Sequence, residues 1–62
     1  MKMTLKNWQV KSLYRWVYVV GYIYNDEKGR FEDGTLITTS AVKRIDFENK
    51  VVETLNSTYY LE

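Results

Sequence analysis

The segment from Leu13 to Tyr24 constrains the fold most, because both of its alternating faces are apolar. Successive side chains of a β-strand point to opposite faces. One face would carry Tyr14, Trp16, Tyr18, Val20, Tyr22 and Tyr24. The other would carry Leu13, Arg15, Val17, Val19, Gly21 and Ile23. A strand with one solvated face alternates apolar with polar residues, so we predict one long strand over 13–24 with contacts on both sides.

Two explanations account for this two-sided strand. The strand bends at Gly21 and serves both sides of a closed barrel, or one of its faces is covered by another protein chain or by a ligand. We expect both to contribute. The sequence leaves open which face is internal.

The rest of the chain also has the character of β structure. Aromatic residues make up 16% of it, Val, Ile and Thr are frequent, and no window shows the apolar spacing of an amphipathic helix. Upstream of the long strand we predict a first strand over Lys6 to Val10, joined to it at Lys11-Ser12. Downstream we predict a loop over Asn25 to Gly29.

Turn residues divide the remaining sequence. Asp33-Gly34 is a strong hairpin signal, which would place Phe31 opposite Leu36. A short strand follows. Val42 and Ile45 are both natural core residues of opposite parity, so we predict a corner with a bulge or tight turn over 40–42.

Two further turns predict a C-terminal meander. Glu48-Asn49 would pair Ile45 with Val52, since Asn tolerates a positive φ. Asn56-Ser57 would pair Val52 with Leu61. These two registers gather one mostly apolar face, and we expect a one-residue slip of either turn to scramble it. That face consists of Ile45, Phe47, Val52, Thr54, Tyr59 and Leu61.

These elements predict an all-β fold in a single small domain over residues 1–62. We expect five or six sequential antiparallel strands that close into a small SH3-like barrel, since closure hides strand edges. The alternatives are a strongly bent meander and a flat meander that dimerises. A domain of this size buries about 60% of the surface that its unfolded chain exposes, so its core is small.

The residue inventory argues against catalysis. The chain has neither Cys nor His, which removes thiolate chemistry and the commonest general base and metal ligand. The acid pairs Asp26-Glu27 and Glu32-Asp33 lie in predicted turns, where we expect solvated side chains rather than a catalytic dyad. We therefore predict a protein that is not an enzyme, with no cofactor and no metal site.

Charge is distributed unevenly although the net charge is only +1. Residues 1–24 hold four basic residues and no acid, whereas residues 25–62 hold five basic and eight acidic residues. The two halves either offset each other across paired strands or form a basic patch for an anionic partner. No apolar run approaches the roughly 18 residues of a membrane span, and no secretory signal is evident. We predict a cytoplasmic protein without a membrane partner.

Basic and aromatic residues alternate in the first half of the chain. They supply a small core with large buried side chains, form a protein-binding or self-association surface, or stack the bases of single-stranded nucleic acid. All three interpretations stay open. The predicted binding residues are Lys11, Tyr14, Arg15, Trp16, Tyr18, Tyr22 and Tyr24.

The second half of the chain contains the run F-E-D-G-T-L-I-T-T-S-A-V from Phe31 to Val42. Ile45-Asp46, then V-E-T at 52–54 and Y-Y-L at 59–61, complete the pattern. It resembles small uncharacterised β proteins encoded by bacteriophages and prophages, which carry F-x-D-G-x-x-I-x-T-S-x-V. Thr38 departs from this pattern, in which a bulkier or basic residue more often precedes the T-S pair. The resemblance covers about half the chain and contains no catalytic motif.

The resemblance implies a phage-type protein acting in the host cytoplasm. We expect a non-enzymatic inhibitor that presents an aromatic surface to a host protein, for instance one of a defence system, and that forms a homodimer or another homo-oligomer. Two alternatives remain open. The chain is a small barrel that binds single-stranded nucleic acid, or it sequesters a small nucleotide signal at a subunit junction.

Overall fold

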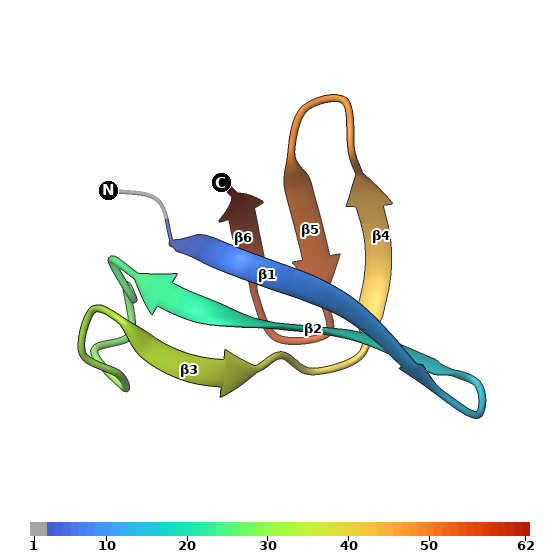
Figure 1. Ribbon diagram of the computed structural model, residues 1–62, viewed down its shortest axis with the longest axis horizontal. Coiled ribbons are helices and arrows are strands. Elements are labelled where there is room, and N and C mark those ends of the chain that lie inside the picture. Colours follow the sequence, from blue (N-terminus) through green and yellow to red (C-terminus); the bar gives the residue numbers. More distant parts are fainter. Residues whose placement is uncertain (1–2) are drawn as a thin grey trace.

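The computed structural model describes residues 3–62, which form one mixed sheet with the strand order β3-β2-β1-β6-β5-β4 (Figure 1). The described residues contain no helix, so the predicted all-β class is confirmed. The strands are β1 (Thr4–Leu13), β2 (Trp16–Tyr24), β3 (Thr35–Thr38), β4 (Val42–Asp46), β5 (Val51–Thr54) and β6 (Thr58–Leu61).

The first strand lies at the centre of the sheet. β1 pairs antiparallel with β2 on one side and parallel with β6 on the other, where Thr4 lies opposite Tyr60 and Leu5 opposite Leu61. The predicted sequential antiparallel order is therefore wrong at this junction. β3 and β4 form the two edges of the sheet, so closure into an SH3-like barrel is not confirmed.

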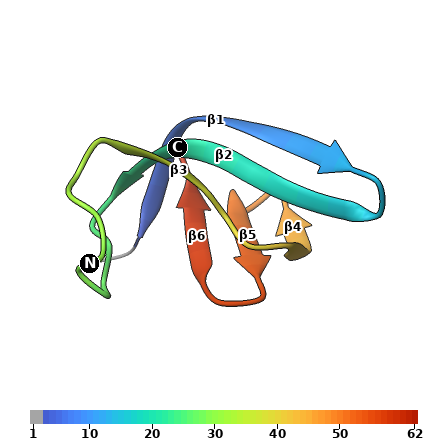
Figure 2. The ribbon, with the colours of Figure 1, turned by 90° about the horizontal axis from the view of Figure 1, so that it is seen from below.

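The core lies between the two halves of this curved sheet. Figure 2 shows β1 and β2 passing over the ends of β6, β5 and β4. Leu5, Val19, Ile23 and Val52 have no exposed surface. The face of β2 that carries Val19, Gly21 and Ile23 is thus internal, and the tyrosine-bearing face points outward. The full core is Met3, Leu5, Val19, Ile23, Ile37, Val52, Tyr59 and Leu61.

The predicted single strand over 13–24 is interrupted by a turn. Tyr14 and Arg15 connect β1 to β2, and Leu13 lies opposite Trp16. Lys11 and Ser12, which were predicted to connect two strands, instead lie within β1. The turn contains no Gly, Asn, Asp or Pro, and these are the residues by which such turns are recognised.

A β-bulge divides the β1–β2 hairpin into two parts. Lys6 lies opposite Tyr22 and Gln9 opposite Val20, so two residues of β1, Asn7 and Trp8, face one residue of β2. That single residue is Gly21. A Cβ atom at Gly21 would lie 3.1 Å from the Cβ of Trp8, too close for ordinary contact. The bend that we predicted at Gly21 coincides with this bulge.

The β4–β5 hairpin has the predicted register, with Ile45 opposite Val52. Its turn is built differently, because the positive φ of 56° falls on Lys50 and not on Asn49. The amide of Asn49 instead donates a 2.8 Å hydrogen bond to the carboxylate of Asp46. Phe47 is 62% exposed, so it does not join the core as predicted; its ring stacks on that of Trp8 at 6.3 Å.

The β5–β6 turn lies one residue earlier than predicted. Val52 faces Tyr59 rather than Leu61, and the N–H of Thr54 donates to the carbonyl of Ser57 across the turn. Moving a two-residue turn by one position shifts the register by two residues and preserves the faces. Thr54 and Tyr59 are therefore buried as predicted, and the expectation that such a slip scrambles the face was wrong.

The turn at Asp33-Gly34 is present, but the predicted hairpin is not. The N–H of Thr35 donates to the carbonyl of Glu32 at 3.2 Å, and Gly34 has a φ of 86°. Phe31 lies outside any strand. Leu36 lies opposite Tyr22 of β2, because β3 completes the sheet beside a strand from much earlier in the chain.

The predicted corner between β3 and β4 is confirmed. Its buried hydroxyl belongs to Thr39, which accepts a 3.0 Å hydrogen bond from the N–H of Val19 and donates to the carbonyl of Ser40. β4 contains the register shift that we expected nearby, between Val42 and Arg44. The pairing of β2 with β3 ends at this corner, so within residues 3–62 the earlier part of β2 pairs with β1 alone.

The bulge leads to a prediction about Asn7, which is exposed and has a φ of 50°. Replacing Asn7 with Val should lower the free energy of unfolding by about 1–2 kcal/mol, because a branched side chain clashes in the left-handed region. Asn7→Gly is the matched control and should change stability by less than about 1 kcal/mol. Urea denaturation measures both. A valine variant as stable as the wild type would mean that β1 is regular here.

Candidate functional site

The hairpin beyond the bulge projects from the sheet as a two-stranded arm (Figure 1). We define the arm as residues 9–18, in which residues 11–13 pair with residues 16–18; at its base, Gln9 and Val10 pair with Val20 and Val19. No other strand of the described chain pairs with these arm residues. An isolated two-stranded ribbon is marginally stable, so the arm relies on its junction with the sheet.

Large apolar side chains cover the arm without packing into the core. Tyr14 is 95% exposed, Trp16 is 61% exposed and Leu13 is 57% exposed. Val10 and Val17 are also exposed, on the opposite face of the arm. A small protein rarely leaves so many neighbouring apolar groups in water unless they contact something else.

The backbone at the tip of the arm is unusual. Tyr14 has a φ of 57°, which is an uncommon conformation for a bulky residue. Two-residue hairpin turns with one positive φ usually place Gly at that position. Glycine would relieve the steric cost of about 1–2 kcal/mol. The chain instead places there a tyrosine whose side chain is the most exposed of the large hydrophobic ones in residues 3–62.

The arm is basic as well as apolar. Lys11 and Arg15 are exposed, and residues 9–18 include no acid. Lys11 lies opposite Tyr18, so the cation and the phenol share one face of the ribbon. None of the described ion pairs involves Lys11 or Arg15. Both cations are therefore available to a partner.

The structure separates the predicted binding residues into two groups. Lys11, Tyr14, Arg15, Trp16 and Tyr18 lie together on the arm.

The other two predicted residues, Tyr22 and Tyr24, lie on the outer face of the main sheet. Tyr22 is exposed and Tyr24 half-buried. The ammonium group of Lys6 lies 4.7 Å above the ring of Tyr24 and 3.4 Å from the carboxylate of Glu62. The ring of Tyr24 therefore already contacts a cation of its own chain. No such contact is described for the five predicted binding residues on the arm.

The sequence analysis did not identify Leu13, Val10 or Val17 as surface residues. The parity of the predicted strand assigned Leu13 and Val17 to the same face as the buried Val19. A turn at Tyr14-Arg15 places Leu13 on the face of Trp16, but its sequence gives no signal. Val17 does share the face of Val19, and it is exposed because it lies on the arm.

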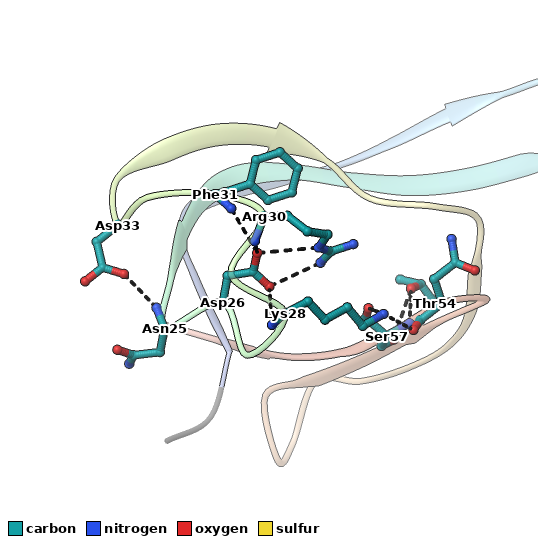
Figure 3. A network of polar contacts seen from close by, with 9 residues as sticks. Asn25, Asp26, Lys28, Arg30, Phe31, Asp33, Thr54 and Ser57 are labelled. Atoms are coloured by element: carbon teal, nitrogen blue, oxygen red, sulfur yellow. Dashed lines mark hydrogen bonds and ion pairs between the residues drawn. The ribbon is translucent and has the colours of Figure 1, made fainter.

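Two carboxylates bond the backbone of the loop between β2 and β3, that of Asp33 to the N–H of Asn25 at 2.8 Å and that of Asp26 to several groups (Figure 3). Asp26 accepts hydrogen bonds from the N–H groups of Arg30 at 2.8 Å, Phe31 at 3.1 Å and Lys28 at 3.3 Å. The guanidinium of Arg30 also donates to it. The Asp26 side chain has no exposed surface, so our prediction that it is solvated was wrong, and its role is to shape the loop.

Lys28 ties this loop to the far end of the sheet. Its ammonium group donates to the carbonyl of Asn56 at 3.1 Å and contacts the hydroxyl of Ser57 at 3.2 Å. A cleft of about 400 Å³ lies beside this tether. Among residues 3–62, the only charged groups in its lining are those of Glu27 and Lys28, and Lys28 is already bonded. The cleft is lined by Met3, Glu27, Lys28, Asn56, Ser57, Thr58 and Tyr60.

Two general features of residues 3–62 bear on function. No cluster of three or more metal-binding side chains occurs among them. None of their elements is a helix long and apolar enough to cross a bilayer.

Comparisons of the chain with protein-family models, curated proteins and solved structures returned no match. The resemblance to phage-encoded proteins therefore stays a prediction. The functional argument rests on the geometry of the arm.

The Asp26 network predicts how stability depends on pH. Burial raises the pKa of Asp26, but the hydrogen bonds from Arg30 and from three backbone N–H groups lower it by more, so the net shift is downward. The unfolded chain binds this proton more tightly, with a pKa of about 3.9. The stabilisation is therefore present above about pH 4 and is lost as pH falls further.

Asp26→Asn should remove part of this acid-induced loss of stability and should also lower stability at pH 7. The matched control is Glu27→Gln, at an exposed neighbour, which should keep the stability of the wild type at pH 7. Urea denaturation from pH 7 to below 4 measures both effects. If the wild type and Asp26→Asn lost the same free energy of unfolding as the pH fell, the network would not stabilise the fold.

Proposed function

We propose that this protein binds another protein through the arm, without catalysis, and that it thereby blocks its partner. The observation that carries the proposal is Tyr14, with a φ of 57° and a side chain that is 95% exposed. Strained backbone that brings no gain in packing is typical of functional positions. Stability favours glycine at this position, whereas contact with a partner favours tyrosine.

The neighbours of Tyr14 support a contact surface of the same kind. Trp16, Tyr14 and Arg15 belong to the three residue types that most often dominate interface energies. Burying an apolar side chain contributes about 25 cal/mol for each Å² removed from water. The surface of Leu13 and Trp16 that stays exposed, 57% and 61%, contributes nothing of this kind. A partner that covered these side chains would gain the free energy of their burial.

The chemistry of the arm describes the surface that it fits. The partner offers an apolar recess for Trp16 and Leu13, with carboxylates at its rim for Lys11 and Arg15. Opposite charges at the rim accelerate association and set orientation. A protruding hairpin suits a recessed site, as do the long loops of some engineered binders.

The proposed partner is a bacterial host protein, and the proposed site of action is the host cytoplasm. This part follows from the resemblance of residues 31–61 to phage-encoded proteins. That pattern covers β3 to β6 and the turns between them, and the arm lies outside it. In this proposal the shared pattern supplies the scaffold, and the arm supplies specificity.

Tyr14→Gly provides the sharpest test, because it should separate folding from binding. The variant should keep or raise the free energy of unfolding, by up to about 1 kcal/mol, and should lose its partner. Trp16→Ala should also lose binding while remaining folded. Affinity purification from bacterial lysate followed by quantitative mass spectrometry would identify a protein retained by the wild type and depleted with both variants.

Leu55→Ala is the matched control, since Leu55 is 63% exposed but lies in the β5–β6 turn. It should retain the same protein as the wild type. Retention by Tyr14→Gly and Trp16→Ala at the level of the wild type would refute the proposal.

Single-stranded nucleic acid is the second candidate, favoured by the lysine and arginine beside Tyr14, Trp16 and Tyr18. The aliphatic Leu13, Val10 and Val17 argue against it, because they offer no stacking surface. The arm also carries only two cations. Fluorescence anisotropy with a labelled oligothymidine distinguishes the two candidates. Binding that weakens steeply with added salt would show that the arm binds nucleic acid rather than a protein.

A further inference from the structure

The two edges of the sheet differ in how they are protected. β4 carries Lys43 and Arg44 and contains a register shift, which are common devices against edge-to-edge pairing. β3 reads T-L-I-T, with no charge and no proline, and it pairs with β2 without interruption. In Figure 1 the free side of β3 faces away from the rest of the sheet.

The backbone groups on the free side of β3 follow from its pairing with β2. The N–H of Thr39 donates to the carbonyl of Val19 at 2.9 Å. Hydrogen-bonding direction alternates along an antiparallel strand, so Ile37 also faces β2. Leu36 and Thr38 then direct their N–H and C=O groups toward the open edge.

We propose that a second copy of this chain pairs with that edge, β3 against β3, antiparallel about a two-fold axis at Ile37. Leu36 lies opposite Thr38 of the partner subunit, and the two symmetry-related pairs exchange four backbone hydrogen bonds. The two six-stranded sheets become one continuous sheet. This inference does not depend on the proposed function of the arm.

Charge and burial favour a second copy over a foreign strand. An uncharged edge meets its own copy without like-charge repulsion, whereas two β4 edges would bring Lys43 and Arg44 together. Leu36 is 56% exposed and lies beside Tyr22 on the outer face, so pairing covers part of this leucine with Thr38 of the partner subunit. Ile37 stays in its own core, where it is 7% exposed.

The dimer determines where the arms lie. The arm continues β2 beyond the residue that faces Thr38. Antiparallel pairing places the Thr38 ends of the two β3 strands at opposite ends of the joint. The dimer therefore carries one arm at each end and presents two separate binding surfaces.

Engineered cysteines test this register directly, because the chain contains no cysteine of its own. Leu36→Cys protein is mixed with Thr38→Cys protein under mild oxidation. In a hydrogen-bonded pair the two Cα atoms are about 5.5 Å apart, which suits a disulfide. The Cα atoms of residue 36 in the two chains would be roughly 8–9 Å apart, which is too far for a disulfide. The mixed disulfide should exceed either homodisulfide roughly fivefold or more.

Sedimentation velocity gives the second measurement. The wild type should form dimers as its concentration rises, since a joint this small belongs to the weak class of interfaces. Thr38→Lys should stay monomeric with an unchanged circular dichroism spectrum, and Leu55→Lys should dimerise like the wild type. A wild type that stays monomeric at every concentration would overturn the proposal. So would a dimer without the preferred mixed disulfide, including one joined through the arms.

Discussion

The close approach of Gly21 to Trp8 is the contact on which the rest of the structure depends. Because Gly21 has no side chain, two residues of β1 fit opposite one residue of β2. The hairpin bends there, so its first part joins the sheet and its second part leaves the sheet as the arm. The same bulge positions Trp8 to pack against the core and to stack on Phe47. Core and arm are therefore consequences of one local irregularity.

The sequence predicts local features of this fold better than long-range ones. Alternation identified the inward residues of β5 and β6, and Asp33-Gly34 identified a real turn. Both signals come from residues within a few positions of the structure that they predict. The parallel pairing of Leu5 with Leu61 has no such signal, since any apolar strand is a suitable neighbour for another. The tip of the arm was missed because Tyr14 occupies a position where turns usually have glycine.

The candidate site illustrates the same limit. Composition identified the basic and aromatic residues of the first half of the chain, and five of them do lie together on the arm. Parity within one long strand could not separate Tyr24, which Lys6 engages, from Trp16, which is left in water. The bulge opposite Gly21 makes that distinction, because β2 joins the main sheet on the Tyr24 side of it and belongs to the arm on the Trp16 side.

The central position of β1 has a consequence for biosynthesis. Its second neighbour, β6, leaves the ribosome about fifty residues after it. Until then β1 can form only the hairpin with β2, and its other side has no strand to pair with. Non-local pairings of this kind slow folding, because the loop must close before the contact is made. One side of β1 thus stays without a neighbouring strand until β6 has been made.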